Sequence, residues 1–184
     1  MKRLLDILLA GIALLALAPV MLLLAVLVRL DSPGPALYRQ VRIGRGAQPF
    51  TMLKFRSMVT AADRIGGYAT AADDSRITRL GRFIRRGSLD ELPQLINVLK
   101  GDMSLVGPRP DVPAQRELYT EDEWRMRHSV RPGLTGLAQA TLRSEATVEQ
   151  RKALDLAYVG HRSFWGDIGI LLLTFRRITG KGAN

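Results

Sequence analysis

The stretch LLDILLAGIALLALAPVMLLLAVLV, residues 4–28, decides the fold because it is apolar along almost its whole length. About 20 such residues are enough for a helix to cross the hydrocarbon of a bilayer. The cluster DSPGP at residues 31–35 then marks a turn. We therefore expect two parts, a membrane-embedded helical segment at residues 1–30 and a membrane-associated domain at residues 31–184.

Positive charges flank the apolar stretch on both sides. Lys2 and Arg3 precede it, and Arg29 is the first of several arginines that follow it. The positive-inside rule places both flanks in the cytoplasm, which one straight spanning helix cannot achieve. Pro19 lies near the middle of the stretch, where a missing N–H and a bulky ring disturb a helix. The sequence predicts a re-entrant helix-break-helix hairpin that bends at Pro19, with a single span as the main alternative.

The composition narrows the classes of protein that fit the remaining chain. The 184 residues include 27 Lys and Arg against 17 Asp and Glu, and they contain no cysteine. Without cysteine there can be no disulfide framework, thiolate zinc site or cysteine nucleophile. The positive charge suits anionic membrane lipids, phosphate-bearing substrates or nucleic acid. Because the apolar stretch already points to a membrane, we expect no nucleic-acid partner.

Residues 37–55 have the pattern of a short β-hairpin. Apolar and polar residues alternate, and the glycines of residues 44–46 interrupt them as a turn would. This hairpin carries Arg42, Lys54 and Arg56, which can meet phosphate groups or lipid headgroups. Residues 59–75 lack a clear apolar period, and we expect a loop there, with or without a short helix.

An acidic pair, Asp90-Glu91, precedes a helical pattern that ends at Lys100. Ser88 and Glu91 have the spacing of a capping box, but Pro93 would then fall too deep in the helix. We therefore favour Asp90 as the N-cap of a helix over residues 90–100. Whether Ser88 or Asp90 is the N-cap, both carboxylates lie at a helix start, where backbone N–H groups favour negative charge and phosphate.

Arginines surround this acidic pair in the sequence. Arg82, Arg85 and Arg86 come just before it, and the segment GPRP after the helix presents Arg109 in a rigid backbone. Arg109 could also be a simple solvated loop residue. Carboxylates, arginines and a helix start are the components of phosphoryl chemistry on a diphosphate. Mg²⁺ would use one or two carboxylates with substrate oxygens, and an aspartate can attack phosphorus directly.

The C-terminal third contains a glycine-rich loop and an amphipathic pattern. The loop RPGLTG begins with Arg131. A helical face follows after Phe164-Trp165, and its members are Ile168, Leu171, Leu172, Phe175 and Ile178. It suits a helix lying in the membrane interface, although a core-packed helix is equally compatible. Asp167 is a candidate helix cap first and a candidate ligand second.

The expected fold class is therefore α+β, mostly helical, with a β-hairpin and interfacial amphipathic helices.

Six segments resemble one known family along nearly the whole chain. They are KRLLDILLA, DSPGPALYRQVRIG, FTMLKFRSM, RITRLGRFIRRGSLDELPQLINVLKGDMSLVGPRP, RPGLTGLAQ and FWGDIGILLLTF. The chain is similar to the bacterial sugar transferases, the monotopic polyprenyl-phosphate phosphoglycosyl transferases. Its small size favours the single-domain members, such as those of Campylobacter N-glycan assembly.

The resemblance implies a two-step transfer of a sugar 1-phosphate from a UDP-sugar to polyprenyl phosphate, with release of UMP. Asp90 would be the nucleophile that holds the phosphosugar covalently, and Glu91 would bind Mg²⁺ beside it. Arg85, Arg109 and Asp167 match positions associated with the nucleotide sugar. The basic residues Lys54, Arg56 and Arg131 complete the predicted substrate-binding set.

The resemblance also implies a location and further partners. We expect the protein on the cytoplasmic face of the bacterial inner membrane, where downstream glycosyltransferases could meet it. An inactive scaffold that binds polyprenyl phosphate or UDP-sugar is the alternative function. The sequence does not identify the sugar.

Overall fold

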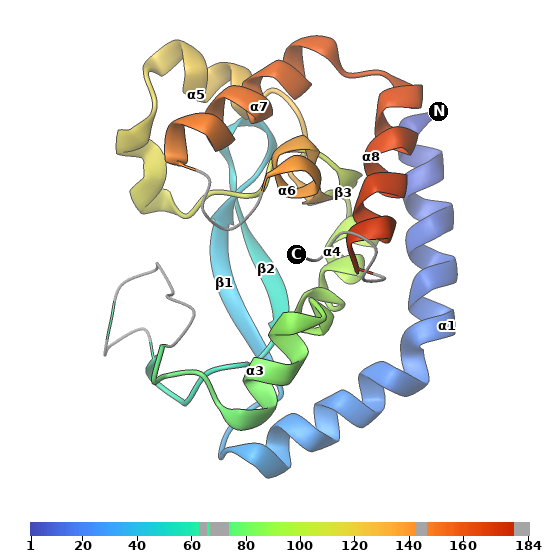
Figure 1. Ribbon diagram of the computed structural model, residues 1–184, viewed down its shortest axis with the longest axis vertical. Coiled ribbons are helices and arrows are strands. Elements are labelled where there is room, and N and C mark those ends of the chain that lie inside the picture. The colour runs from blue at the N-terminus through green and yellow to red at the C-terminus, as the bar shows by residue number, and fades with distance from the viewer. Residues whose placement is uncertain (63–65, 67–73, 143–146, 179–184) are drawn as a thin grey trace.

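The computed structural model describes residues 1–62, 66, 74–142 and 147–178. Helices lie at one end and along one side of a long antiparallel hairpin, and the apolar N-terminal helix runs along that side of the molecule (Figure 1). The predicted mostly helical α+β class with a short β-hairpin is confirmed. Most of the expected loop at residues 59–75 lies outside the described residues.

Helix α1 spans Lys2–Asp31 and is the one described helix long and apolar enough to cross a membrane. Its assignment is continuous through Pro19, so the predicted break is not a gap in the helix. Figure 1 instead shows α1 changing direction along its length. A proline removes one hydrogen bond and crowds one carbonyl, which bends a helix without ending it. Many of its apolar side chains face outward, as Leu15 does with 79% exposed.

The predicted hairpin is confirmed. Strand β1, Leu37–Ile43, pairs in antiparallel register with β2, Pro49–Phe55. A 3₁₀ turn at Arg45–Ala47 joins them, and Gly46 takes a positive φ of 69° there. Such a φ favours glycine, which explains the residue at the tip of the turn.

The segment around the acidic pair differs from the prediction. Helix α3, Arg79–Arg86, is followed by a 3₁₀ turn at Leu89–Glu91 and then by α4, Gln94–Lys100. The predicted N-cap at Asp90 is wrong, because Asp90 lies inside the 3₁₀ turn. The capping box from Ser88 is also absent, since Ser88 has a left-handed φ of 53° and makes no side-chain cap.

The end of α4 agrees with the sequence pattern. Gly101 follows Lys100 with a φ of 97°, and its N–H closes onto the last helical carbonyls. At the other end Pro93 is the N-cap of α4, where its missing N–H costs nothing because the first N–H groups of a helix have no intrahelical partner. The predicted helix is therefore real but begins four residues late.

A short parallel pairing forms beyond α4. Strand β3, Ser104–Val106, lies beside β4, Gly133–Thr135. Glycines allow this close approach, because a Cβ on Gly136 would come within 2.2 Å of the carbonyl oxygen of Gly107. The two glycine-punctuated motifs noted in the sequence thus pack against each other.

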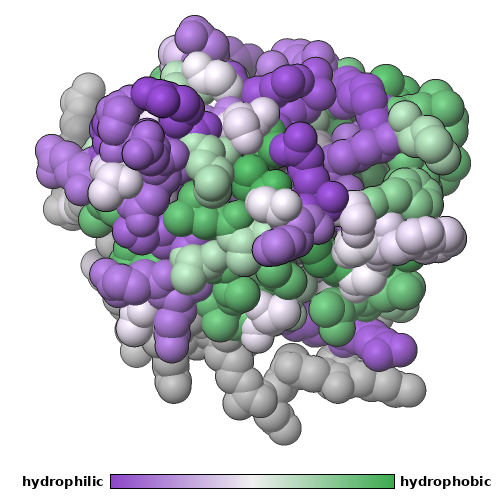
Figure 2. All heavy atoms as spheres, turned by 90° about the horizontal axis from the view of Figure 1, so that it is seen from above, coloured by the Kyte–Doolittle hydropathy of each residue, from purple (hydrophilic) through white to green (hydrophobic). Residues whose placement is uncertain are grey.

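The remaining elements cover this pairing. They are a 3₁₀ helix at Pro113–Leu118, α5 at Glu121–Arg127, α6 at Leu137–Thr141, α7 at Val148–His161 and α8 at Phe164–Ile178. Helix α8 uses one side for packing, with Ile170 and Asp167 buried, and exposes Leu172, Phe175 and 77% of Trp165 on another. The core-packed interpretation is therefore confirmed for one side of α8, and the interfacial interpretation of the exposed side stays a prediction. Figure 2 shows apolar side chains gathered along the edge where Figure 1 places α1 and α8.

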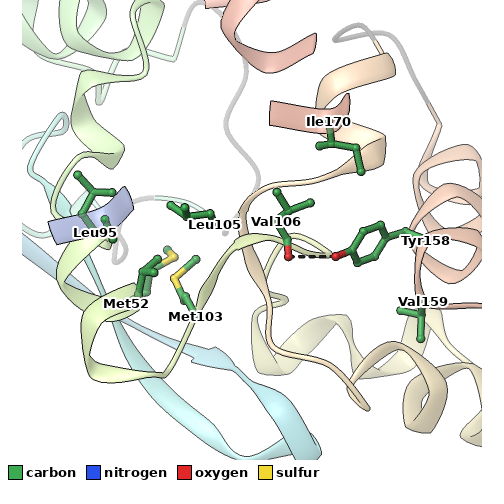
Figure 3. Close-up of a cluster of buried hydrophobic side chains, with 10 residues drawn as sticks. Met52, Leu95, Met103, Leu105, Val106, Tyr158, Val159 and Ile170 are labelled. Atoms are coloured by element: carbon green, nitrogen blue, oxygen red, sulfur yellow. Dashed lines mark hydrogen bonds between the residues drawn. The ribbon is translucent and has the colours of Figure 1, made fainter. Parts of the chain in front are cut away.

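Two apolar cores hold the elements together. The larger core joins Met52, Leu95 and Met103 to Tyr158 and Ile170, and Figure 3 shows the Tyr158 hydroxyl directed at the Val106 carbonyl. The smaller core packs the far end of α1, with Leu24 and Val28, against β2 and α3; its other buried members are Ala36, Phe55 and Ile84.

Both ends of α1 are fixed to the same folded body. At its start, Arg3 donates to the carbonyls of Val98 and Leu99 at 2.6 and 3.0 Å. At its end, the buried Arg56 donates to the carbonyls of Val28, Ser32 and Pro33. The first and last turns of α1 therefore lie against one domain.

Candidate active site

The acidic pair lies on the 3₁₀ turn between α3 and α4. A 3₁₀ helix has about three residues per turn, so consecutive side chains point roughly 120° apart. Asp90 and Glu91 consequently face different surroundings although they are neighbours in the chain. Hydrogen bonds from the backbone of Glu91 and Leu92 to Ser88 and Leu89 hold the turn.

Glu91 is held between two cations. Its Oε1 accepts hydrogen bonds from Lys54 Nζ at 2.9 Å and from Arg109 Nη2 at 2.7 Å. Burial alone would raise the pKa of Glu91, but Arg109 and Lys54 outweigh it and lower the pKa to about 2. Burial and the nearby Arg109 lower the pKa of Lys54, while Glu91 opposes them. Glu91 is therefore an anion at neutral pH.

Asp90 is in the opposite situation. It is buried, and it has no side-chain hydrogen bond or ion pair with any other described residue. Burial raises the pKa of Asp90, and the Glu91 carboxylate adds to the rise against the charges of Lys54 and Arg85. Arg85 is half-buried at the end of α3 and likewise has no described partner. An unpaired carboxylate close to cations is available to react with an incoming group.

The loop that carries Arg109 is held from several sides. Arg127 donates to the carbonyl of Arg109 at 2.8 Å, and Arg42 donates to the carbonyl of Pro110 at 2.8 Å. The N–H of Gly107 bonds the carbonyl of Thr135 at 2.9 Å. The backbone that carries the Arg109 side chain is therefore fixed, as the GPRP motif indicated.

The structure brings together only part of the predicted site. Asp90, Glu91, Lys54, Arg85 and Arg109 form one cluster, which joins β2, α3, the 3₁₀ turn and the loop after β3. The association of the hairpin lysine with the acidic pair could not be seen in the sequence pattern.

Three predicted residues make other contacts. Arg56 binds the carbonyls at the end of α1, and Arg131 donates to the carbonyl of Gly101 at 2.8 Å. Asp167 accepts from Lys2 and, at 2.8 Å, from the Tyr158 hydroxyl. None of the three has a described contact with the acidic pair, and their substrate-binding roles stay predictions.

Several buried charged residues were not anticipated from the sequence. Asp6 accepts from Ser104 Oγ at 2.9 Å and from the N–H of Leu105 at 3.0 Å. Arg127 pairs with Asp111 and Asp155, all of them buried. A signal for Asp6 was present, since a carboxylate inside an apolar stretch usually has a partner. No comparable signal marks Arg127.

The acidic pair has suitable donors for a divalent cation. Mg²⁺ is usually bound through one or two carboxylates together with substrate phosphate oxygens. Glu91 binds both cations through Oε1, and neither its Oε2 nor the Asp90 carboxylate has a described hydrogen bond. The part of the chain that the structure describes contains no group of three or more His, Asp or Glu side chains that could hold a metal ion. A cation here would therefore depend on the substrate for further ligands.

Replacement of Glu91 by Gln is expected to destabilise the fold by about 1–3 kcal/mol at pH 7, because Lys54 and Arg109 lose their anion. The pKa of Glu91 is lowered from 4.5 to about 2, so its ionised form stabilises the fold above about pH 4.5. That contribution is lost as the pH falls from about 4.5 through about 2. Chemical unfolding in detergent micelles at pH 7 and at pH 3 measures the difference.

The matched control for this prediction is Glu117→Gln, which changes an exposed glutamate with no described side-chain partner. It should leave the free energy of unfolding unchanged at both pH values. A Glu91→Gln effect as large at pH 3 as at pH 7 would contradict the role assigned to the ion pairs.

Known proteins are similar to this chain along most of its length. The family model described as "Bacterial sugar transferase" matches residues 1–181. A UDP-glucose:undecaprenyl-phosphate glucose-1-phosphate transferase of Caulobacter vibrioides is 47% identical over 94% of this chain and 67% of its own length. A protein of the same name from Escherichia coli is 45% identical over 100% of this chain and 41% of its own.

A relative from Aeromonas hydrophila is named for a different sugar. It is a UDP-N-acetylgalactosamine-undecaprenyl-phosphate N-acetylgalactosaminephosphotransferase, 42% identical over 100% of this chain and 45% of its own length. The chain thus spans less than half of the Escherichia coli and Aeromonas proteins. With a family match along 181 residues and such identities, the chain belongs to the bacterial sugar transferase family.

Proposed function

We propose that this protein transfers a sugar 1-phosphate from a UDP-sugar to undecaprenyl phosphate and releases UMP. The names of its relatives supply the substrates, since they specify UDP-glucose or UDP-N-acetylgalactosamine and undecaprenyl phosphate. The observation that carries the proposal is the buried, unpaired Asp90 beside the cation-bound Glu91. This arrangement suits attack on a diphosphate better than it suits simple binding.

In the first step, an Asp90 carboxylate oxygen attacks the β-phosphorus of the UDP-sugar. The bond from that phosphorus to the bridging oxygen breaks, and UMP leaves with the electron pair. The sugar 1-phosphate is then an acyl phosphate on Asp90. Lys54, Arg85 and Arg109 lie close enough to Asp90 to act on its charge, and they would offset the negative charge on the diphosphate. The raised pKa of Asp90 makes its ionised carboxylate a stronger nucleophile than an exposed aspartate.

In the second step, a phosphate oxygen of undecaprenyl phosphate attacks the same phosphorus. The acyl phosphate bond breaks, Asp90 regains its carboxylate, and undecaprenyl diphosphate sugar is the product. The acceptor lies in the membrane, so the reacting aspartate must be close to the bilayer. The proximity of α1 to α3 and α4, which flank Asp90, supports this requirement.

Mg²⁺ is part of the proposal. Asp90 and Glu91 would hold it, and when bound it would neutralise charge on the diphosphate. The open Oε2 of Glu91 supports this assignment, because it leaves one carboxylate oxygen available while Oε1 keeps Lys54 and Arg109 in place.

The Asp90→Asn variant is expected to lower UMP release by at least about 1,000-fold, since an amide cannot attack phosphorus. Purified protein in detergent is incubated with undecaprenyl phosphate, Mg²⁺ and a panel of UDP-sugars, and UMP is quantified. Asp102→Asn is a matched control, because Asp102 is a half-buried carboxylate at the other end of α4. It should retain most of the activity.

Two results would contradict this assignment. Near wild-type turnover by Asp90→Asn would exclude this residue as the nucleophile. Binding of a UDP-sugar by the wild-type protein without UMP release from any donor in the panel would favour the scaffold alternative. Mass spectrometry should also detect a phosphosugar adduct on the peptide containing Asp90.

Removal of divalent cations tests the metal separately. UMP release should fall at least about 100-fold with EDTA and recover when Mg²⁺ is added in excess. Activity that persists after exhaustive chelation would contradict the metal assignment without affecting the role of Asp90.

We also propose that α1 is re-entrant and that the protein is monotopic on the cytoplasmic face of the inner membrane. The contacts of Arg3 and Asp6 tie the first turns of α1 to the folded domain, and those of Arg56 tie its last turn to the same domain. A helix that spanned the bilayer once would separate these two sets of contacts. Pro19 inside the helix is the natural place for the bend.

The absence of cysteine from the sequence allows a labelling test of this topology. Single cysteines are placed between Met1 and Lys2, at exposed Pro35, and at Leu22, which is 70% exposed in the middle of α1. The first two should react with a membrane-impermeant maleimide only from the cytoplasmic side, and Leu22→Cys should react from neither side. Periplasmic labelling of the N-terminal cysteine would exclude the re-entrant arrangement.

A further inference from the structure

A cavity lies away from the acidic pair, at the start of α1. It has a volume of about 310 Å³. Segments far apart in the sequence form it: the first turn of α1, the tip of the hairpin, the loop before β4 and the end of α7. Its polar lining residues include Lys2, Arg3, Asp6, Arg45, Arg131 and Arg162.

The lining is strongly basic. Five of these side chains are cationic, and Asp6 is the one carboxylate among the lining residues. Asp6 accepts hydrogen bonds from Ser104 and from the N–H of Leu105, and its single negative charge can balance only one of the five positive charges. Even with Asp6 in the lining and Lys2 paired with Asp167, the lining has an excess of positive charge that attracts anions.

Two of the cations have no described partner. Lys2 pairs with Asp167, Arg3 with two α4 carbonyls, and Arg131 with the carbonyl of Gly101. The side chains of Arg45 and Arg162, in contrast, form no hydrogen bond or ion pair with any other described residue. Both line the cavity and are exposed, so their guanidinium groups are open to a ligand.

The chemistry of the lining favours a phosphate group. Guanidinium groups bind phosphate oxygens through paired N–H donors, and several of them around one cavity suit an anion with several oxygens. Tyr158 also lines the cavity, and its hydroxyl is bonded to Asp167 and to the Val106 carbonyl. The volume admits a phosphate together with a small polar headgroup.

The cavity is distinct from the acidic pair. Arg3 and Arg131 bind carbonyls at the C-terminal end of α4, whereas Glu91 precedes its N-terminal end. The seven residues of α4 alone separate the two places by about 10 Å at 1.5 Å per residue. None of the cavity residues is Asp90, Glu91, Lys54 or Arg109.

The surroundings of the cavity indicate where its phosphate comes from. Leu4, 64% exposed, follows Arg3 directly, and exposed Trp165 follows Arg162 after two residues. A basic cavity beside outward-facing apolar and aromatic side chains is typical of the membrane interface. We propose that this cavity binds the phosphate of an anionic membrane lipid, with the acyl chains along the exposed apolar side of α1. This inference rests on the proposed placement of α1 in the membrane and not on the transfer reaction.

Native mass spectrometry of the detergent-purified protein tests the proposal. Phosphatidylglycerol, undecaprenyl phosphate and phosphatidylcholine are titrated separately, and the bound fraction is measured. Wild-type protein should bind the two anionic lipids in preference to phosphatidylcholine. Arg45→Gln and Arg162→Gln should each weaken phosphatidylglycerol binding about fivefold, and the double variant about 25-fold, because each removes one open cation.

Arg125→Gln is the matched control, since it removes the same charge from a 75% exposed side chain on α5, outside the cavity. It should bind phosphatidylglycerol within twofold of wild type. Asp90→Asn should also bind as wild type, which separates this site from the transfer reaction. Circular dichroism should show all variants folded.

Two outcomes would overturn the proposal. Equal loss of phosphatidylglycerol binding in Arg125→Gln and in the cavity variants would mean that net charge, and not this cavity, attracts the lipid. A further arm uses inorganic pyrophosphate without lipid. If the cavity variants lose pyrophosphate binding while phosphatidylglycerol binding is unchanged, the ligand is a soluble phosphate and the lipid assignment is wrong.

Discussion

The buried carboxylate of Asp6 connects the membrane helix to the rest of the protein. It lies one and a half turns into α1 and accepts hydrogen bonds from Ser104 and from the N–H of Leu105 on β3. A buried carboxylate that loses its donors costs several kcal/mol, so the start of α1 cannot leave β3 without a large penalty. Strand β3 leads directly into the loop that carries Arg109. One interaction therefore fixes the membrane segment and the backbone of the candidate site together.

Buried side chains in the interior also hold the loop that carries Arg109. Arg109 is presented to Glu91 by a backbone that Arg42 and Arg127 hold through carbonyl hydrogen bonds. Arg127 is itself buried between Asp111 and Asp155, which rigidly orients its guanidinium. The backbone that presents Arg109 to Glu91 is thus fixed before any substrate arrives. Such preorganisation is what electrostatic stabilisation of a charged transition state requires.

Local patterns in the sequence predicted the elements whose structure depends on local chemistry. The hairpin followed from alternation and its glycine turn, and the end of α4 followed from Lys100-Gly101. The start of α4 was mispredicted, because Ser88 takes a left-handed φ and a 3₁₀ turn follows it, and no local pattern in the sequence marks that conformation. The grouping of Lys54 with Glu91 and the partners of Asp6 arise from contacts 37 and about 98 residues apart. No periodicity in a single sequence encodes such pairings.

The two neighbouring carboxylates illustrate how one short turn can produce two chemical roles. Both side chains start from the same 3₁₀ turn, yet burial raises the pKa of Asp90 while Arg109 and Lys54 lower that of Glu91. Surroundings that shift the pKa values of two neighbouring carboxylates in opposite directions are typical of sites where the two residues have different roles. Glu91 holds Lys54 and Arg109, and the charges of these two cations oppose the rise that burial causes in the pKa of Asp90. An α-helical start, as the sequence pattern suggested, would have given Asp90 backbone N–H partners and reduced its reactivity. The departure from that pattern at Ser88 is therefore what leaves Asp90 free to react.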